Sequence, residues 1–94
     1  MKARWNGTVV AESDEAVEVR GYHYFPPGSV RTELLQRVPK TARDLECPHG
    51  VQFFDVGEGD ARSDRAAWSY EAPRPEMQLV DHWIGFWHDV TVEP

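Results

Sequence analysis

The residues best suited to chemistry lie in a short turn, Cys47-Pro48-His49-Gly50, which contains the only cysteine of the chain. A thiolate is the reactive form of cysteine, and a nearby imidazole lowers the pKa of a thiol when a turn brings the two side chains together. This pattern predicts Cys47 and His49 as the catalytic pair of a thiol-dependent enzyme. The competing interpretation is that Cys47 is a small apolar side chain in the core, since free cysteines are among the most often buried residues.

Aromatic side chains form a second candidate site. Trp68 and Tyr70 alternate along one predicted strand, and Tyr24 and Phe25 lie in another aromatic segment. Rings that carry N–H and O–H groups are typical of pockets for small molecules. We therefore expect a ligand-binding cleft near Cys47, lined by these four side chains. The alternative is that the rings are simply the core, because so small a domain needs its aromatic residues for stability.

Other kinds of site have less support in the residues. The four histidines are scattered and no Cys-x-x-Cys pair is present, so we expect no metal site and no cofactor. Asp81-His82 and His88-Asp89 join an acid to an imidazole, but neighbours on a strand point to opposite faces, which argues against pairing within either dipeptide. Gly57-Glu58-Gly59-Asp60 offers glycines and carboxylates, yet it lies where a hairpin loop is expected, with no following helix or nearby lysine.

Charge and hydropathy restrict the partners. The net charge of the 94 residues is −6, whereas proteins that bind the phosphate backbone need clustered Lys and Arg, so we expect no nucleic-acid partner. No apolar run has the length of a signal peptide or a membrane span, and we expect no membrane partner. A single free cysteine fits a reducing compartment. These features predict a cytoplasmic protein.

Short segments with alternating hydrophobicity dominate the chain and predict strands. The predicted strands cover residues 4–11, 17–20, 41–46, 51–56, 66–70, 83–87 and 90–93. The economical arrangement joins the first two in a hairpin across the polar turn at 12–15. Gly85 lies inside an apolar strand, which suggests a bulge or a close approach by another backbone.

Residues 29–37 have a different pattern, because Val30, Leu34 and Leu35 fall at helical spacing between Ser29 and Pro39. This spacing predicts one short helix near residues 29–37. With about six to eight short strands and one helix, the chain is expected to fold as a compact, mainly-β single domain over residues 1–94. A barrel, a tent and a pair of packed sheets all fit the periodicity.

Five blocks of residues, spread over nearly the whole chain, carry a family resemblance. They are Trp5-Asn6-Gly7 with Val10-Ala11, Tyr24-Phe25-Pro26 with Val30 and Leu35, Cys47-Pro48 with Gly50, Ala66-Ala67-Trp68-Ser69-Tyr70 with Pro73 and Pro75, and Phe86-Trp87 with Val90. In these blocks the chain resembles the family catalogued as domain of unknown function 427, which also has a nucleotidyltransferase-like label. The resemblance implies a small domain of the β-tent type, a fold better known from zinc-bearing modules and methionine sulfoxide reductases. An aromatic-Lys-Gly sequence usually follows Cys-Pro in the family, whereas His49-Gly50 stands here, so a role of that lysine does not carry over.

These observations leave several functions open. The first is a binding module that holds a small molecule or a peptide in the aromatic cleft near Cys47. The second is a thiol-dependent enzyme that uses Cys47 and His49. A third is an interaction protein, with a homodimer formed through an exposed strand edge near residues 90–93. Only the family label supports a nucleotidyltransferase-like activity.

Overall fold

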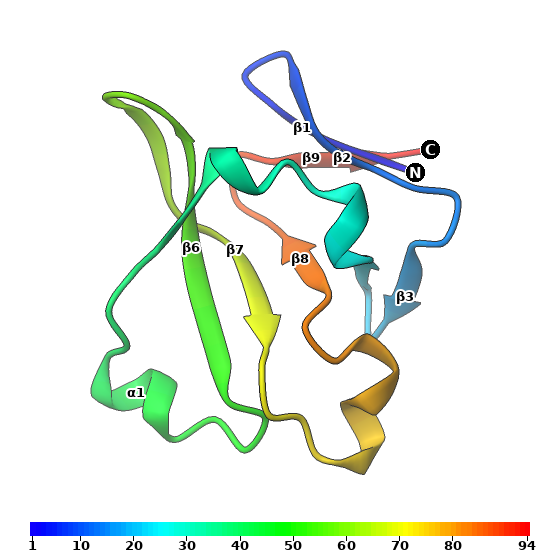
Figure 1. Cartoon of the computed structure of the whole chain (residues 1–94), viewed down its shortest axis with the longest axis vertical. Coiled ribbons are helices and arrows are strands. Elements are labelled where there is room, and N and C mark those ends of the chain that lie inside the picture. Colours follow the sequence, from blue (N-terminus) through cyan, green and yellow to red (C-terminus); the bar gives the residue numbers. More distant parts are fainter.

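Two antiparallel sheets divide the nine strands of the chain between them (Figure 1). The computed structural model describes residues 1–94. The strands are β1 (Lys2–Trp5), β2 (Thr8–Glu12), β3 (Val17–Val19), β4 (Tyr22–Phe25), β5 (Leu35–Arg37), β6 (Val51–Glu58), β7 (Ala61–Tyr70), β8 (Ile84–Phe86) and β9 (Thr91–Glu93). The smaller sheet has the order β2-β1-β9, and the larger has the order β3-β4-β8-β7-β6-β5. The predicted mainly-β fold is confirmed.

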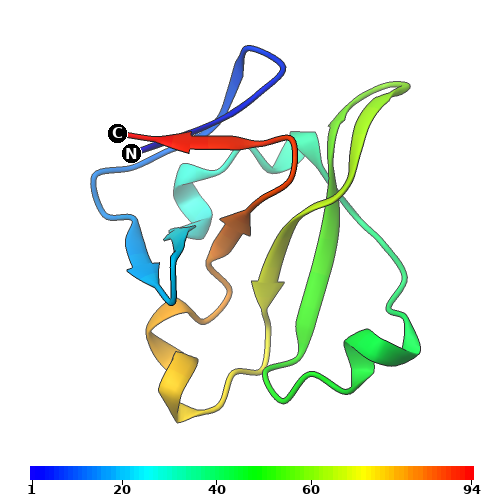
Figure 2. The same cartoon turned by 180° about the vertical axis from the view of Figure 1, so that it is seen from behind.

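Helical segments are few and short. The α-helix α1 covers Ala42–Leu45, and three 3₁₀ helices cover Pro27–Ser29 (η1), Thr32–Leu34 (η2) and Pro75–Val80 (η3). None of these segments has the length and apolar character that a helix needs to cross a membrane. The first and last strands pair in register, with Lys2 opposite Glu93, so the two ends of the chain lie side by side (Figure 2).

Segment 4–11 is two strands rather than the predicted one. Asn6 and Gly7 have φ of 50° and 81° and form the two-residue turn between β1 and β2. An Asn-Gly pair favours this turn because both residues reach the left-handed region at low cost. The same kind of turn recurs at Arg20-Gly21, where β3 pairs with β4. The predicted hairpin between 4–11 and 17–20 is therefore wrong.

The predicted helix near residues 29–37 is shorter than the spacing suggests. This segment begins at the last residue of η1, contains η2 and ends in strand β5, where Leu35 pairs with Val56 of β6. Leu34, the last residue of η2, is buried in the core. The apolar residues have helical spacing because the chain makes two separate 3₁₀ turns here. A run of this length is too short to hold a helix on its own, and pairing at the edge of the sheet determines its conformation.

The α-helix occurs instead at 42–45, where the sequence pattern predicted a strand over 41–46. Thr41 caps it, because its side chain accepts a hydrogen bond from the backbone N–H of Asp44 at 3.1 Å. The Asp44 carboxylate in turn accepts from the backbone N–H of Thr41 at 3.0 Å. This reciprocal capping box satisfies two backbone donors that a short helix would otherwise leave free.

The Asp44 carboxylate also joins α1 to the larger sheet. Arg65 of β7 donates to it at 2.6 Å, and the Arg65 guanidinium lies 4.1 Å from the centroid of the Phe53 ring. Arg65 has φ of 52° in a bulge opposite Asp55, whose carboxylate accepts from the Arg65 backbone N–H at 2.9 Å. The bulge therefore aims the arginine at the helix.

These contacts predict a pH-dependent contribution of Asp44 to stability. The hydrogen bond from Arg65, followed by the one from the Thr41 backbone, holds the pKa of the Asp44 carboxyl below its usual range. The contribution is therefore present above the unfolded-state pKa of about 3.9 and is lost as the pH falls through the lower folded-state value. We expect Asp44→Asn to lower the free energy of unfolding at pH 7 by about 1–2 kcal/mol.

Urea denaturation of the wild type and Asp44→Asn between pH 7 and pH 3 measures this contribution. The difference between the two proteins should shrink once the pH falls below about 4. Glu46→Gln is the matched control, because Glu46 is an exposed neighbour that makes no ion pair. A difference that stays constant over the whole pH range would contradict the assignment.

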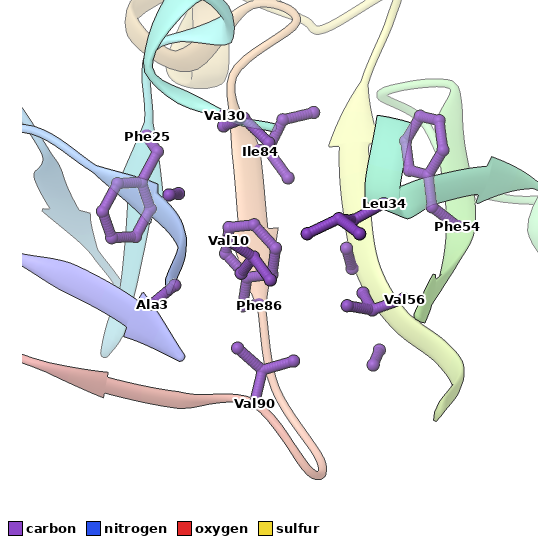
Figure 3. Packing of buried hydrophobic residues seen from close by; sticks show 13 residues of the cluster. Ala3, Val10, Phe25, Val30, Leu34, Phe54, Val56, Ile84, Phe86 and Val90 are labelled. Carbon is purple, nitrogen blue, oxygen red and sulfur yellow. The ribbon is translucent and has the colours of Figure 1, made fainter. Parts of the chain in front are cut away.

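Side chains from both sheets meet in the main hydrophobic core (Figure 3). Val10 of β2 and Phe25 of β4 have no exposed surface. The ring of Phe25 meets the ring of Phe86 edge-to-face, with centroids 5.7 Å apart. Since alternate residues of a strand point to opposite faces, Tyr24 and Trp68 belong to a second cluster on the other face of the larger sheet. The larger sheet thus buries apolar residues on both faces.

Candidate functional site

Trp68 lies at the centre of the second cluster. Its ring centroid is 5.1 Å from that of Tyr22 and 5.8 Å from that of Tyr24, both edge-to-face. The ring of Trp87 also packs against Trp68, with centroids 5.1 Å apart. The predicted aromatic cluster is therefore present. Only 4% of Trp68 is exposed, so the ring is held in place by its neighbours.

The structure brings together four of the five predicted ligand-binding residues and leaves one out. Tyr24, Cys47, Trp68 and Tyr70 all belong to the second cluster. Phe25 follows Tyr24 on β4, points to the opposite face and is fully buried in the main core. Phe25 therefore packs between the two sheets and is separated from the other four by the sheet itself.

Gly85 is the residue that lets Trp68 pack so closely. It pairs with Trp68 across β7 and β8, and a Cβ placed on it would lie 2.6 Å from Cζ2 of the indole. The close approach suggested by this glycine is therefore made by a side chain, the indole ring, rather than by another backbone. An aromatic ring that covers a glycine on the neighbouring strand replaces the packing that the glycine lacks.

Tyr24 keeps its proton within the cluster. Burial raises the pKa of its phenol, and the neighbouring Tyr70 adds to the effect. Only 2% of Tyr24 is exposed. Because the charged form is disfavoured in this setting, the phenol stays neutral at ordinary pH.

Cys47 lies in the turn that follows α1. Its backbone N–H donates to the carbonyl of Asp44 at 3.1 Å, and its own carbonyl accepts from Gly50 at 3.3 Å. The side chain is half-buried and packs against the second cluster. The turn thus places Cys47 against the second cluster.

His49 is engaged away from the thiol. Its Nδ1 accepts a hydrogen bond from the backbone N–H of Arg74 at 3.0 Å, and its Nε2 lies 3.9 Å from a carboxylate oxygen of Glu76. Its ring lies against Tyr70, with centroids 5.3 Å apart. Both ring nitrogens therefore face the 74–76 segment, and the imidazole links this segment to the turn. No hydrogen bond joins it to Cys47.

The structure contains two cavities, and neither is beside Cys47. The first, which we call the Ser69 cavity, has a volume of about 370 Å³. It is lined by Pro27, Thr32, Leu35, Arg37, Phe54, Ser69, Glu71, His82 and Ile84. The second, of about 400 Å³, is lined by Val9, Ala11, Glu12, Ser29 and Arg31. Since Ser69 lies between Trp68 and Tyr70 on β7, the first cavity opens on the opposite face of the sheet from the aromatic cluster.

Ser69 is the unusual member of the cavity wall. Only 2% of the residue is exposed, and its hydroxyl has no hydrogen-bond partner in the protein. A buried polar group without a partner costs roughly 1–3 kcal/mol, and such groups in folded proteins call for an explanation. Phe54, Leu35 and Ile84 supply apolar walls around it.

An ion pair forms one side of the rim. Arg37 donates to both carboxylate oxygens of Glu71, at 3.2 and 2.5 Å. The guanidinium also lies 5.5 Å from the centroid of the Phe54 ring. A planar guanidinium that binds both oxygens of a carboxylate forms the strongest geometry for such a pair. The Glu71 interaction raises the already high pKa of Arg37, so the arginine stays charged.

A second pair, Asp81 and His82, adjoins the cavity. The Asp81 carboxylate lies 2.6 Å from Nδ1 of His82, so the prediction that these neighbours do not pair is wrong. The prediction assumed a strand, whereas His82 has φ of 63° and follows η3, with its backbone N–H bonded to the carbonyl of Tyr70. No such bond forms within His88-Asp89. Because the Ser69 hydroxyl has no partner, these residues do not form the hydrogen-bonded triad of a serine hydrolase.

The remaining candidate chemistries find no assembled site. Nowhere do three His, Cys, Asp or Glu side chains come together in a way that could hold a metal ion. Residues 57–60 lie at the tip of the β6–β7 hairpin, where Glu58 pairs with Ala61 and Gly59-Asp60 form the turn, in agreement with the predicted hairpin loop. A hairpin turn without a following helix lacks the backbone N–H groups that cradle a phosphate at a helix start.

Sequence reasoning missed the residues of the Ser69 cavity. Arg37, Glu71 and His82 are charged or polar residues in separate segments, and no motif connects them. Ser69 did carry a signal. It alternates with Trp68 and Tyr70, so it is a small polar residue at a position that the strand pattern assigns to a buried face.

A comparison with known protein families identifies the family of this chain. No match was found among curated proteins. A family model described as a domain of unknown function (DUF427) matches residues 1–93, which is nearly the whole length. The chain therefore belongs to the DUF427 family.

Proposed function

We propose that this DUF427 domain is a binding module that holds a small molecule in the Ser69 cavity. The observation that supports the proposal is that Ser69, one of the residues lining the cavity, has a buried hydroxyl without a hydrogen-bond partner. A ligand with one hydrogen-bonding group at this point would supply the missing partner. Such a hydrogen bond would offset the cost of burying the Ser69 hydroxyl.

The composition of the wall supports the same function. Binding pockets combine apolar surfaces with a few polar groups that fix the orientation of the ligand. Here Leu35, Phe54 and Ile84 offer apolar surface, while Ser69 and the rim pairs offer polar groups. The volume of about 370 Å³ lies at the low end of the range for small-molecule pockets, which favours a compact molecule over a peptide.

The proposed binding site differs from the aromatic cleft that the sequence suggested. The rings around Cys47 pack against one another, and neither cavity is lined by Tyr24, Trp68 or Tyr70. Those rings stabilise the opposite face of the sheet. A thiol enzyme has no comparable support, because His49 is bonded to Arg74.

An NMR titration tests the binding function. Uncharged ring compounds such as benzamide, cyclohexanecarboxamide and indole-3-carboxamide would be added to ¹⁵N-labelled protein. We expect the amide resonances of Ser69, Phe54 and Ile84 to shift in a saturable manner. The proposal fails if all three probes leave these resonances unchanged, or if the shifts instead centre on Cys47 and Trp68.

Removing the Ser69 hydroxyl should raise stability and weaken binding. We expect Ser69→Ala to increase the free energy of unfolding by about 1 kcal/mol, because it removes a buried group without a partner. The same change should weaken probe binding by about 2- to 10-fold, the value of one hydrogen bond. Thermal and urea denaturation measure the first effect, and the NMR titration measures the second.

Ser63 provides the matched control for this prediction. It is also a buried serine of β7, but its hydroxyl donates to the Asp89 carboxylate at 2.8 Å. Ser63→Ala should therefore lower the free energy of unfolding by about 1–3 kcal/mol, the opposite sign. If Ser69→Ala were as destabilising as Ser63→Ala, the Ser69 hydroxyl would have a partner in the free protein and the proposal would lose its support.

A further inference from the structure

The charges around the Ser69 cavity restrict the chemistry of its occupant. Arg37 is the only Arg or Lys among the lining residues, and Glu71 is the only carboxylate. The two are bound to each other through both carboxylate oxygens. The charge of Arg37 is therefore balanced at the rim by a carboxylate that binds it in a bidentate manner.

An anionic ligand would meet an unfavourable setting here. To reach the Arg37 guanidinium, a carboxylate or phosphate would have to displace Glu71 or lie beside it. Like charges at such a distance repel each other, and the displaced or incoming carboxylate would be partly desolvated without a partner. The second acid near the cavity, Asp81, faces His82 and adds to the same repulsion.

Two hydroxyls and one ring nitrogen remain without a partner at the cavity. Ser69 has an unpartnered hydroxyl, and Thr32 contributes a second hydroxyl at the exposed part of the wall. Nδ1 of His82 is taken up by Asp81, which leaves Nε2 as the uncommitted ring nitrogen. Hydroxyls both donate and accept hydrogen bonds, so they complement an amide or an alcohol.

We propose that the Ser69 cavity selects uncharged molecules, a compact ring that carries an amide or hydroxyl group, and rejects carboxylates and phosphates of the same shape. This inference rests on the proposed binding function and names its ligand class. The ring lies against Phe54, Leu35 and Ile84, and the polar group meets Ser69. Nucleoside phosphates are outside this class, which separates the site from the chemistry of a nucleotidyltransferase.

Pairs of probes that differ only in charge test the inference. Benzamide and benzoate are one pair, and cyclohexanecarboxamide and indole-3-carboxamide with their carboxylates are two others. At pH 7.5 the carboxamide of each pair should bind at least about 10-fold more tightly, which corresponds to about 1.4 kcal/mol. Carboxylates that bind the wild type as tightly as the carboxamides would overturn the inference while leaving the binding function intact. If no probe bound at all, the binding function itself would fail.

A single substitution should reverse the preference. Glu71→Gln keeps the shape of the side chain but releases the Arg37 charge, so carboxylate probes should gain about 5-fold or more in affinity, while carboxamides change by less than about 2-fold. Glu33→Gln is the matched control, because Glu33 is an exposed acid 3.8 Å from Arg31 that does not line the cavity. Equal effects of the two substitutions on carboxylate binding would show that net charge alone acts, which would also overturn the inference.

Discussion

Replacing Gly85 by valine is expected to remove most of the stability of the domain. A Cβ at this position lies 2.6 and 2.8 Å from Cζ2 and Cε2 of Trp68, closer than side-chain carbons approach other atoms. The indole cannot move aside, because Tyr22 and Trp87 pack against it. Gly85 is also paired on both sides, with Tyr24 and Trp68, so the backbone is fixed in the middle of the sheet.

Alanine at the same position should cost about 2–3 kcal/mol, and valine more, against a total stability of about 5–15 kcal/mol for a typical domain. Urea denaturation followed by tryptophan fluorescence measures both variants. Gly28→Ala is the control, since a Cβ there meets nothing within 4 Å, and it should change stability by less than about 1 kcal/mol. In a Trp68→Leu background the cost of Gly85→Ala should shrink, because the clashing ring is gone. An unchanged cost there would contradict the assigned contact.

The second large effect is expected from Ser69→Val, which should stabilise the protein and strongly weaken its binding of probes. Valine removes the unpartnered hydroxyl, favours a strand and extends methyl groups towards the cavity. We expect a gain of about 1 kcal/mol in the free energy of unfolding. Binding of benzamide should weaken by about 30- to 100-fold, because its polar group would be buried against methyl groups without a partner.

Ser63→Val is the counterpart on the same strand. It breaks the hydrogen bond to Asp89 and leaves that carboxylate without its donor, so it should destabilise the protein and leave benzamide binding unchanged. Denaturation measures the stability of each valine variant, and NMR titration measures its affinity for benzamide. A Ser69→Val protein that bound benzamide like the wild type would show that the probe does not occupy the cavity.

The sequence correctly predicts the strands whose side chains alternate regularly between two faces. Segments 51–56 and 66–70 lie inside β6 and β7, because their apolar residues alternate between two buried faces. The failures have local causes. The alternation continues on both sides of the Asn6-Gly7 turn and therefore predicts a single strand there, and Thr41 begins a predicted strand although it caps a helix.

Part of the candidate site could also be predicted from the spacing of residues. Trp68 and Tyr70 alternate along β7, so their position on a common face could be predicted from spacing. The Ser69 cavity could not be, because it depends on which strands become neighbours. Arg37 reaches Glu71 only because the sheet order places β5, β6 and β7 side by side, and hydrophobicity patterns do not determine strand order.

The most direct test of the account is where a bound probe lies. Intermolecular nuclear Overhauser effects between benzamide and the methyl groups of the protein distinguish the two faces of the larger sheet. We predict effects to Leu35 and Ile84, which line the Ser69 cavity. Effects to Val51 and Met77, which belong to the aromatic cluster beside Cys47, would contradict it.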